Sequence, residues 1–242
     1  RDDVRLAGVN SINWARVLAQ VVYYFTSAVA LGAPNRKISF SVPTGNFGDI
    51  FAGYVAKRMG LPIDRLIIAT NQNDILHRTV KTGNHTKSGV KPSISPSMDI
   101  QVSSNFERLI FDLYNRDGDK VSELFDALKS KGTFTLSIEA NKKLNDEFDS
   151  GCCSDIETSQ AIKKYHNSMG EILCPHSAIG VSVSEEYMNE TPIITLATAH
   201  PAKFPDAVEK ACGIIPNLPP HMADLYVRDE RMIRVSGDLN AL

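Results

Sequence analysis

The strongest constraint on the fold is a strand, a turn, a helix and a second strand in close succession within residues 38–70. Residues 38–42 are rich in the β-branched and aromatic side chains of a short strand. The Pro-Thr-Gly turn at residues 43–45 leads into a helix expected at 49–59. Residues 65–70 are an almost continuous apolar run, which is typical of a parallel strand covered on both faces. This order predicts a βαβ unit, and so an α/β fold with a mostly parallel sheet and flanking helices.

A long helix is expected over residues 10–31, where apolar residues recur at helical spacing. Either Ser11 or Asn13 has a side chain suited to capping its start. The apolar stretch at 21–33 is too short to span a bilayer, so we interpret it as a buried helix. Further helices are expected at 106–114, 119–131, 154–169, 178–190 and 206–212, with one more strand at 192–197.

Two segments are expected to lie outside regular structure. Residues 79–97 lie in a polar stretch rich in Asn, Ser, Thr, Gly, Pro and Lys, which predicts a long mobile loop. Residues 216–242 are expected to form a peripheral tail. Residues 134–153 show no clear pattern. The first residue is Arg1 and not Met, which suggests a start within a longer protein, although a processed N-terminus would look the same.

The composition is that of an ordinary globular protein. Of 242 residues, 43% are hydrophobic and 22% are charged, which argues against disorder. The net charge of −2 offers no basic face for a nucleic acid or a membrane surface, so we expect neither partner. The four cysteines form no C-x-x-C pair, and no histidine pair has zinc spacing. We therefore expect no metal site and free thiols in a reducing cytoplasm.

The turn that follows the first strand has the features of an anion-binding site. Its sequence at residues 42–49 is Val-Pro-Thr-Gly-Asn-Phe-Gly-Asp, and it opens a helix whose N-terminal N–H groups carry partial positive charge. The glycine spacing is neither that of a nucleotide P-loop nor that of a dinucleotide fold. Spacing alone leaves two interpretations open, a phosphate cradle and a purely structural turn.

The literal sequence of this turn resembles the phosphate-binding loop of the threonine synthase family, in its fungal and Gram-negative class. That family belongs to the tryptophan-synthase-β-like (fold type II) enzymes, which use pyridoxal 5'-phosphate (PLP). Three other segments resemble the same family in the same order: residues 10–16, residues 95–108, and Thr-Ala-His-Pro-Ala-Lys-Phe at 198–204. The resemblance implies that residues 1–242 are the C-terminal part of the large PLP domain.

The resemblance also implies the roles of individual residues. Gly45, Asn46, Phe47 and Gly48 would bind the phosphate of PLP. Thr198, at the end of a late strand, would hydrogen-bond the pyridine nitrogen. A neutral hydroxyl at that place would leave the nitrogen largely unprotonated and the ring a moderate electron sink. The alternative for Thr198 is a strand-end residue that bonds its own backbone.

For the substrate, O-phospho-L-homoserine, the resemblance implies binding of its phosphate by Asn10, Ser11 and Arg16. Helix N-termini, Ser and Asn side chains and an Arg fork all suit an anion. The alternative is a capped helix followed by a solvated arginine. His176, His200 and Lys203 receive no catalytic role, and Cys174 stands where the family more often has an acidic residue.

The implied activity of the family is threonine synthesis, the conversion of O-phospho-L-homoserine and water to L-threonine and phosphate. The lysine that forms the Schiff base with PLP would lie upstream of this chain, so no catalytic residue is assigned within it. Two alternatives remain. One is a threonine-synthase-like phospholyase that eliminates phosphate to give a keto acid, and the other is a non-catalytic fragment that binds a phosphorylated ligand.

Overall fold

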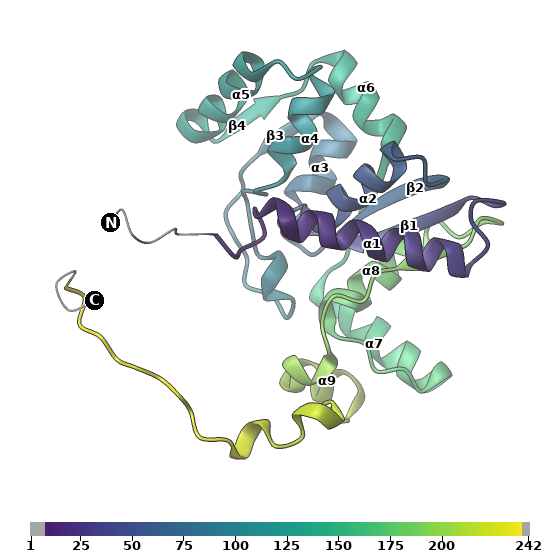
Figure 1. Cartoon of the computed structure of the whole chain (residues 1–242), viewed down its shortest axis with the longest axis vertical. Helices are drawn as coiled ribbons and strands as arrows, with labels where there is room; N and C mark the ends of the chain where they lie inside the picture. The colour runs from purple at the N-terminus through teal and green to yellow at the C-terminus, as the bar shows by residue number, and fades with distance from the viewer. Residues whose placement is uncertain (1–7, 239–242) are drawn as a thin grey trace.

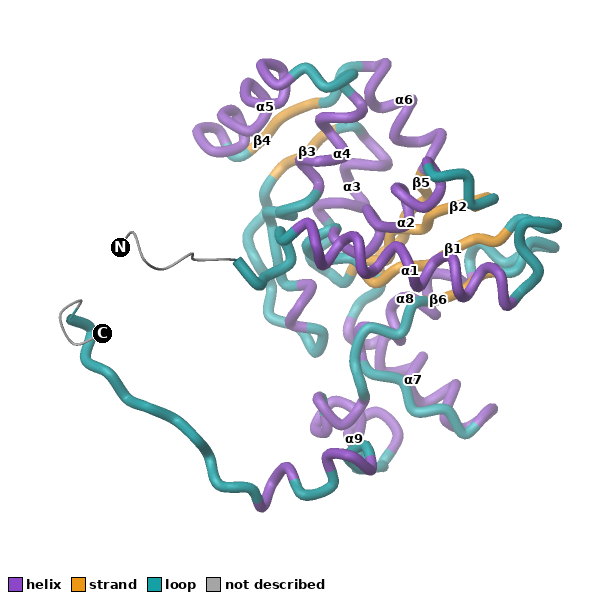
Figure 2. The backbone as a smooth tube through the Cα atoms, viewed as in Figure 1, coloured by secondary structure: helices purple, strands orange, loops and turns teal. Residues whose placement is uncertain are grey.

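A parallel sheet forms the centre of the computed structural model, which describes residues 8–238. Its four strands lie in the order β5-β2-β1-β6 (Figure 2), and every neighbouring pair is parallel. The strands are β1 (Ile38–Pro43), β2 (Ile63–Thr70), β5 (Phe148–Cys152) and β6 (Ile193–Thr195). The prediction of an α/β fold with a parallel sheet is confirmed, and the first βαβ unit lies where the sequence placed it.

Helices cover both faces of this sheet because the side chains of its central strands alternate between two buried clusters. On β2, Leu66 and Ile68 pack into the larger cluster, whereas Ile67 and Ala69 pack into the smaller one. Helices α1 (Trp14–Ala30) and α2 (Gly48–Arg58) lie against the first face. Helix α8 (Pro175–Glu185) lies against the second, with α7 (Asp155–Met169) and α9 (Pro205–Cys212) beside it (Figure 1).

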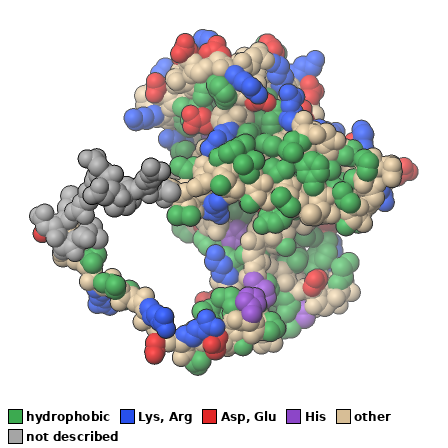
Figure 3. Space-filling model, viewed as in Figure 1, with side chains coloured by type: hydrophobic (Ala, Val, Ile, Leu, Met, Phe, Trp, Pro, Cys, Tyr) green, Lys and Arg blue, Asp and Glu red, His purple; other side chains and the backbone are tan. Residues whose placement is uncertain are grey.

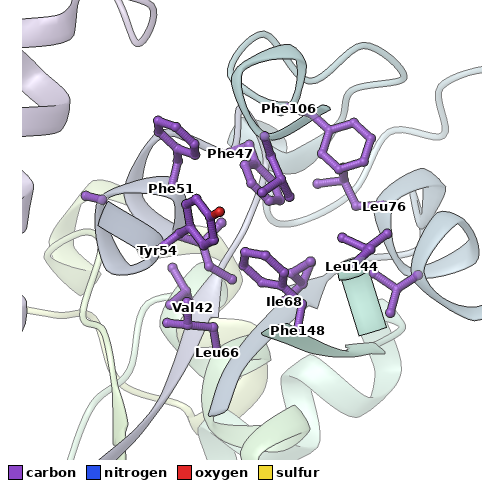
Figure 4. Packing of buried hydrophobic residues seen from close by; sticks show 14 of the residues in the cluster. Val42, Phe47, Phe51, Tyr54, Leu66, Ile68, Leu76, Phe106, Leu144 and Phe148 are labelled. Carbon is purple, nitrogen blue, oxygen red and sulfur yellow. The ribbon is translucent and has the colours of Figure 1, made fainter. Parts of the chain in front are cut away.

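A group of shorter elements extends the larger cluster beyond the sheet. It consists of α3 (Ile75–Thr82), α4 (Phe106–Leu113), α5 (Gly118–Lys131), α6 (Ile138–Glu147) and an antiparallel pair, β3 (Asn84–Thr86) with β4 (Thr133–Thr135). Phe47 lies at the centre of this packing. Its ring centroid is 5.2 Å from that of Phe106 and 5.9 Å from that of Phe148 (Figure 4). The turn after β1 is therefore fixed to the hydrophobic core.

Two predicted segments differ from the structure. The loop predicted at 79–97 was wrong over 79–86, where α3 continues to Thr82 and β3 follows. The polar composition concealed this helix, in which Ile75, Leu76, Thr79 and Val80 are the buried residues. Helix α8 spans Pro175–Glu185 and not the predicted 178–190. It begins earlier because Pro is well suited to the first helical position.

The long N-terminal helix is only half buried. Val17, Val21, Tyr24 and Ala28 face the core. Its outer side is also apolar and forms a hydrophobic band across the molecule (Figure 3). The exposed members of this band on and beside α1 are Ile12, Trp14, Leu18, Val22, Tyr23, Val29 and Leu31. The prediction of a buried helix thus holds for only one side of α1, since no element within residues 8–238 covers the outer side.

The C-terminal segment leaves the body of the fold after α9. Over residues 214–238 it is mostly exposed, and its regular structure there consists of two short 3₁₀ turns, Pro220–Met222 and Leu225–Val227 (Figure 1). Residues 1–7 and the end of the predicted tail, residues 239–242, lie outside the described residues. No helix within residues 8–238 is long and apolar enough to cross a membrane.

Candidate functional site

The turn between β1 and α2 presents a row of backbone N–H groups. Helix α2 begins at Gly48, and Phe47 precedes it in the left-handed conformation (φ 63°) without a side-chain cap. The N–H groups of residues 45–50 make no hydrogen bond to any other group in the described part of the chain. Free donors at the positive end of a helix are suited to binding an anion such as phosphate.

Contacts from behind hold the carbonyl groups of this cradle (residues 45–48) in place. The Ser103 hydroxyl donates to the Gly45 carbonyl at 2.8 Å, and the Asn105 N–H donates to the Asn46 carbonyl at 3.0 Å. In a trans peptide the carbonyl and the next N–H point in opposite directions. Holding these two carbonyls from behind therefore turns the N–H groups of Asn46 and Phe47 toward the other side.

The cradle opens into a small pocket of about 120 Å³. The residues that line it are Ser11, Arg16, Gln20 and residues 43–50. The structure thus brings two of the three predicted substrate-binding residues, Ser11 and Arg16, into the same pocket as the predicted cofactor-binding residues. Asn10 does not line it, and its side chain accepts a hydrogen bond from the Ile12 N–H. The helix cap is Asn13, which accepts from the Ala15 N–H at 2.9 Å.

Thr198 lies outside this pocket but follows the neighbouring strand at the same edge of the sheet. Strand β6 pairs in parallel with β1, with Thr195 opposite Ser41, so the residues that follow both strands leave the sheet on one side. The Thr198 N–H donates to the Ser177 hydroxyl at 3.2 Å. Thr198 is an exposed residue, and its hydroxyl makes no hydrogen bond within residues 8–238, so the alternative of a hydroxyl bonded to its own backbone is not observed.

Cys174 has a clear local role at the start of α8. Its sulfur accepts a hydrogen bond from the Ser177 N–H at 3.3 Å and so caps the helix. The same sulfur lies 3.2 Å from the Ser177 hydroxyl, which in turn accepts from Thr198. The thiol of Cys174 therefore acts as the N-cap of α8.

The histidines near the turns have structural partners. His176 accepts a hydrogen bond from the Ser97 N–H at 3.2 Å and packs against Phe204. Burial, with Lys203 nearby, lowers the pKa of His176 to about 4, so the ring is neutral at physiological pH. His200 caps a short 3₁₀ turn by accepting from the Ala202 N–H. Across residues 8–238, no group of His, Cys, Asp and Glu side chains could hold a metal ion.

Asp49 is a pocket residue that the sequence did not single out. It lies in the first turn of α2, and the Tyr24 hydroxyl donates to its backbone carbonyl at 2.8 Å. Burial raises the pKa of Asp49 to about 6, and a second contact of the Tyr24 hydroxyl, 3.5 Å from the carboxylate oxygen Oδ1, opposes that rise. Since the carboxyl ionises as the pH rises through this value, the pocket gains a negative charge there.

This titration predicts a pH-dependent anion affinity. Sulfate keeps a constant charge over this range, and its affinity for the full-length protein should fall roughly tenfold as the pH rises through about 6. Asp49→Asn should bind sulfate more tightly at neutral pH and lose this dependence, whereas the remote control Asp64→Asn should keep it. Isothermal titration at several pH values measures this, and an unchanged slope in Asp49→Asn would contradict the role of this carboxyl.

Comparison with known proteins gives a consistent result over nearly the whole chain. The family model described as threonine synthase, C-terminal, matches residues 177–242. The threonine synthase of Pseudomonas aeruginosa is 53% identical over 238 residues, which cover 97% of this chain and 51% of that protein. The chain belongs to the threonine synthase family.

Solved structures of threonine synthases have the same fold. The PLP-bound enzyme from Brucella melitensis superposes with a TM-score of 0.91 at 57% identity, over 93% of this chain and 49% of that one. The yeast enzyme gives a TM-score of 0.86 at 42% identity, over 94% and 50%. The chain therefore spans about half the length of the relatives that it matches.

Proposed function

We propose that this chain is the C-terminal half of a threonine synthase, which converts O-phospho-L-homoserine and water to L-threonine and phosphate. The observation that carries this proposal is the pocket in which the free N–H groups of residues 45–50 meet Arg16 and Ser11. The high identity to threonine synthases then selects one activity among those that such an anion site could serve.

The cofactor of the proposed enzyme is PLP, which one of the structural relatives binds. The chain fits its phosphate in two respects. The cradle has unbonded N–H donors, and Gly45 leaves no room for a side chain, since a Cβ there would lie 2.6 Å from the Ser97 carbonyl oxygen. When bound, PLP would supply an electron sink for elimination and for the addition of water.

The residues of this chain would hold the cofactor at both of its ends. Gly45, Asn46, Phe47 and Gly48 would donate backbone hydrogen bonds to the cofactor phosphate, and the Thr198 hydroxyl would bond the pyridine nitrogen. The position of Thr198 beyond the strand next to β1 supports this assignment, because ligands of parallel sheets lie at the carboxyl ends of the strands.

The substrate phosphate would be bound by Ser11 and Arg16, together with Asn10, which directly precedes Ser11 in the sequence. Ser11 and Arg16 line the pocket, and Arg16 is the cation among its lining residues. A guanidinium group binds a phosphate through two parallel hydrogen bonds. The residue that carries out proton transfer would be the cofactor-binding lysine of the other half, as the family resemblance implies.

A cytoplasmic location is part of the same proposal. All four cysteines, Cys152, Cys153, Cys174 and Cys212, are free thiols. Free thiols are typical of reducing compartments.

Product analysis of the full-length protein tests the proposed activity. With PLP and O-phospho-L-homoserine, we expect L-threonine and phosphate in equal amounts. Phosphate with a keto acid, and no threonine, would instead support the phospholyase alternative. The chain of 242 residues, assayed alone with PLP, should release neither product, and turnover by that chain alone would contradict the assignment of the catalytic lysine to the other half.

A further inference from the structure

The sequence segment at residues 103–108, Ser-Ser-Asn-Phe-Glu-Arg, contains a buried link between the two parts of the pocket. Asn105 precedes α4 and is fully buried, with an exposed fraction of 0%. Its side-chain amide donates to the Asn46 carbonyl at 2.9 Å and to the Ser11 carbonyl at 2.9 Å. One side chain thus joins the cradle to the chain that precedes α1, across 59 and 94 residues of sequence.

Arg108 extends this link from the next turn. Its Nη2 donates to the Ile12 carbonyl at 2.9 Å, and its guanidinium carbon lies 5.5 Å from the centroid of the Trp14 ring. Its Nε donates to the side-chain oxygen of Asn105 at 3.1 Å. Because that oxygen is occupied by Arg108, the amide nitrogen of Asn105 faces the two carbonyls.

The link has a direct consequence for the donors in the pocket. The Asn46 carbonyl is held from behind by two bonds from Asn105, so the N–H of Phe47 points the opposite way. The bonds to Ser11 and Ile12 fix the two residues just before Asn13, the N-cap of α1, and hence the start of the helix that carries Arg16. Asn105 and Arg108 are not among the residues that line the pocket.

We propose that Asn105 and Arg108 are positioning residues that hold the cradle and the Ser11–Arg16 segment in a fixed position relative to each other, so that a bound ligand contacts both. The proposal rests on the proposed function for the identity of the ligand. It assigns neither residue a contact with the ligand. Loss of the link should therefore weaken binding at both parts of the pocket together.

The test compares variants of the full-length protein. Asn105→Asp keeps the shape but replaces the donor by an acceptor that faces two carbonyls. We expect a roughly tenfold rise both in the Kd for PLP and in the KM for O-phospho-L-homoserine. Arg108→Lys should raise both constants as well, since an ammonium group cannot replace the guanidinium fork. The rise should be smaller than in Asn105→Asp, because the positive charge is kept. If Asn105→Asp does not fold, Arg108→Lys, at a partly exposed position, carries the test.

Arg78 provides a control because its guanidinium also donates to a backbone carbonyl and to a side-chain oxygen, but away from the pocket. Its Nη2 donates to the Thr86 carbonyl at 3.0 Å and its Nε to Asp74 at 2.8 Å. Arg78→Lys should lower the melting temperature as much as Arg108→Lys does, without changing Kd or KM. Equal stability losses with unchanged Kd and KM in all variants would overturn the proposal.

A double-mutant cycle separates positioning from general loosening. If Asn105 acts through the segment that carries Arg16, Asn105→Asp should raise KM much less in an Arg16→Ala background than in the wild type. Fully additive effects would contradict the link. Sulfate affinity, measured in the same variants, tests the link even if the wild-type protein binds no PLP. Failure of wild-type PLP binding would overturn the proposed function alone.

Discussion

Gly45→Ala should reduce the affinity of the full-length protein for PLP by at least about a hundredfold. An added Cβ would lie 2.6 Å from the Ser97 carbonyl oxygen and 3.4 Å from Met98 Cα, and both atoms belong to the backbone. Neither can rotate away, so the turn itself must move. Two charged hydrogen bonds lost from the cradle, at about 1.5–3 kcal/mol each, would account for an effect of this size. Titration followed by the visible absorbance of PLP measures it.

Two other glycines provide comparisons for the effect of Gly45→Ala on PLP affinity. At Gly48 a Cβ would lie 3.3 Å from the Asn105 amide nitrogen, which is tight but involves a side chain, so Gly48→Ala should have an intermediate effect. At Gly118, the first residue of α5, a Cβ would meet nothing within 4 Å. Gly118→Ala should leave PLP affinity unchanged. Equal affinities in all three variants would show that the turn is only structural.

The central fold could be predicted from sequence because its signals are local. The strand at residues 38–42, the helix after the turn and the apolar run at 65–70 each occur within a few residues of the expected bounds. Helix α3 was missed because four buried residues in a polar segment make a weak signal. What makes that helix stable is packing against α6 and β5, which lie far along the sequence.

The interpretation of α1 as a buried helix shows a different limit. A helix that is apolar on all sides is normally covered on all sides. The sequence pattern therefore indicates that this helix is suited to being covered on all sides. Within residues 8–238, only the side that carries Val17, Val21, Tyr24 and Ala28 is covered. Periodicity alone does not indicate which element supplies the other cover.

For the site, the glycine turn could be recognised from its literal sequence, but its supports could not. The contacts of Ser103 and Asn105 to the cradle join residues about sixty positions apart. Asp49 acquires its raised pKa only when burial removes it from water. The shared pocket of Ser11 and Arg16 with residues 45–48 likewise arises from the packing of α1 on α2. Such features depend on tertiary structure, which local sequence patterns do not indicate.

Because Arg16 lines the same pocket as the cradle, Arg16→Ala is the second substitution for which we expect a large effect. Arg16 is largely exposed, donates through Nη1 to the Val9 carbonyl at 3.2 Å, and borders the pocket. If it binds the substrate phosphate, the loss of one charge-assisted contact should cost about 1.5–3 kcal/mol, or on the order of tenfold to a hundredfold in KM for O-phospho-L-homoserine. Steady-state kinetics of the full-length protein measure this.

Two comparisons decide which phosphate Arg16 binds. PLP affinity should barely change in Arg16→Ala if the cradle alone holds the cofactor, and Arg16→Lys should restore KM only in part. A large loss of PLP affinity with an unchanged KM would instead assign Arg16 to the cofactor phosphate, which the single pocket makes physically possible. If both constants stay at their wild-type values, Arg16 is a solvated charge whose main contact is the Val9 carbonyl.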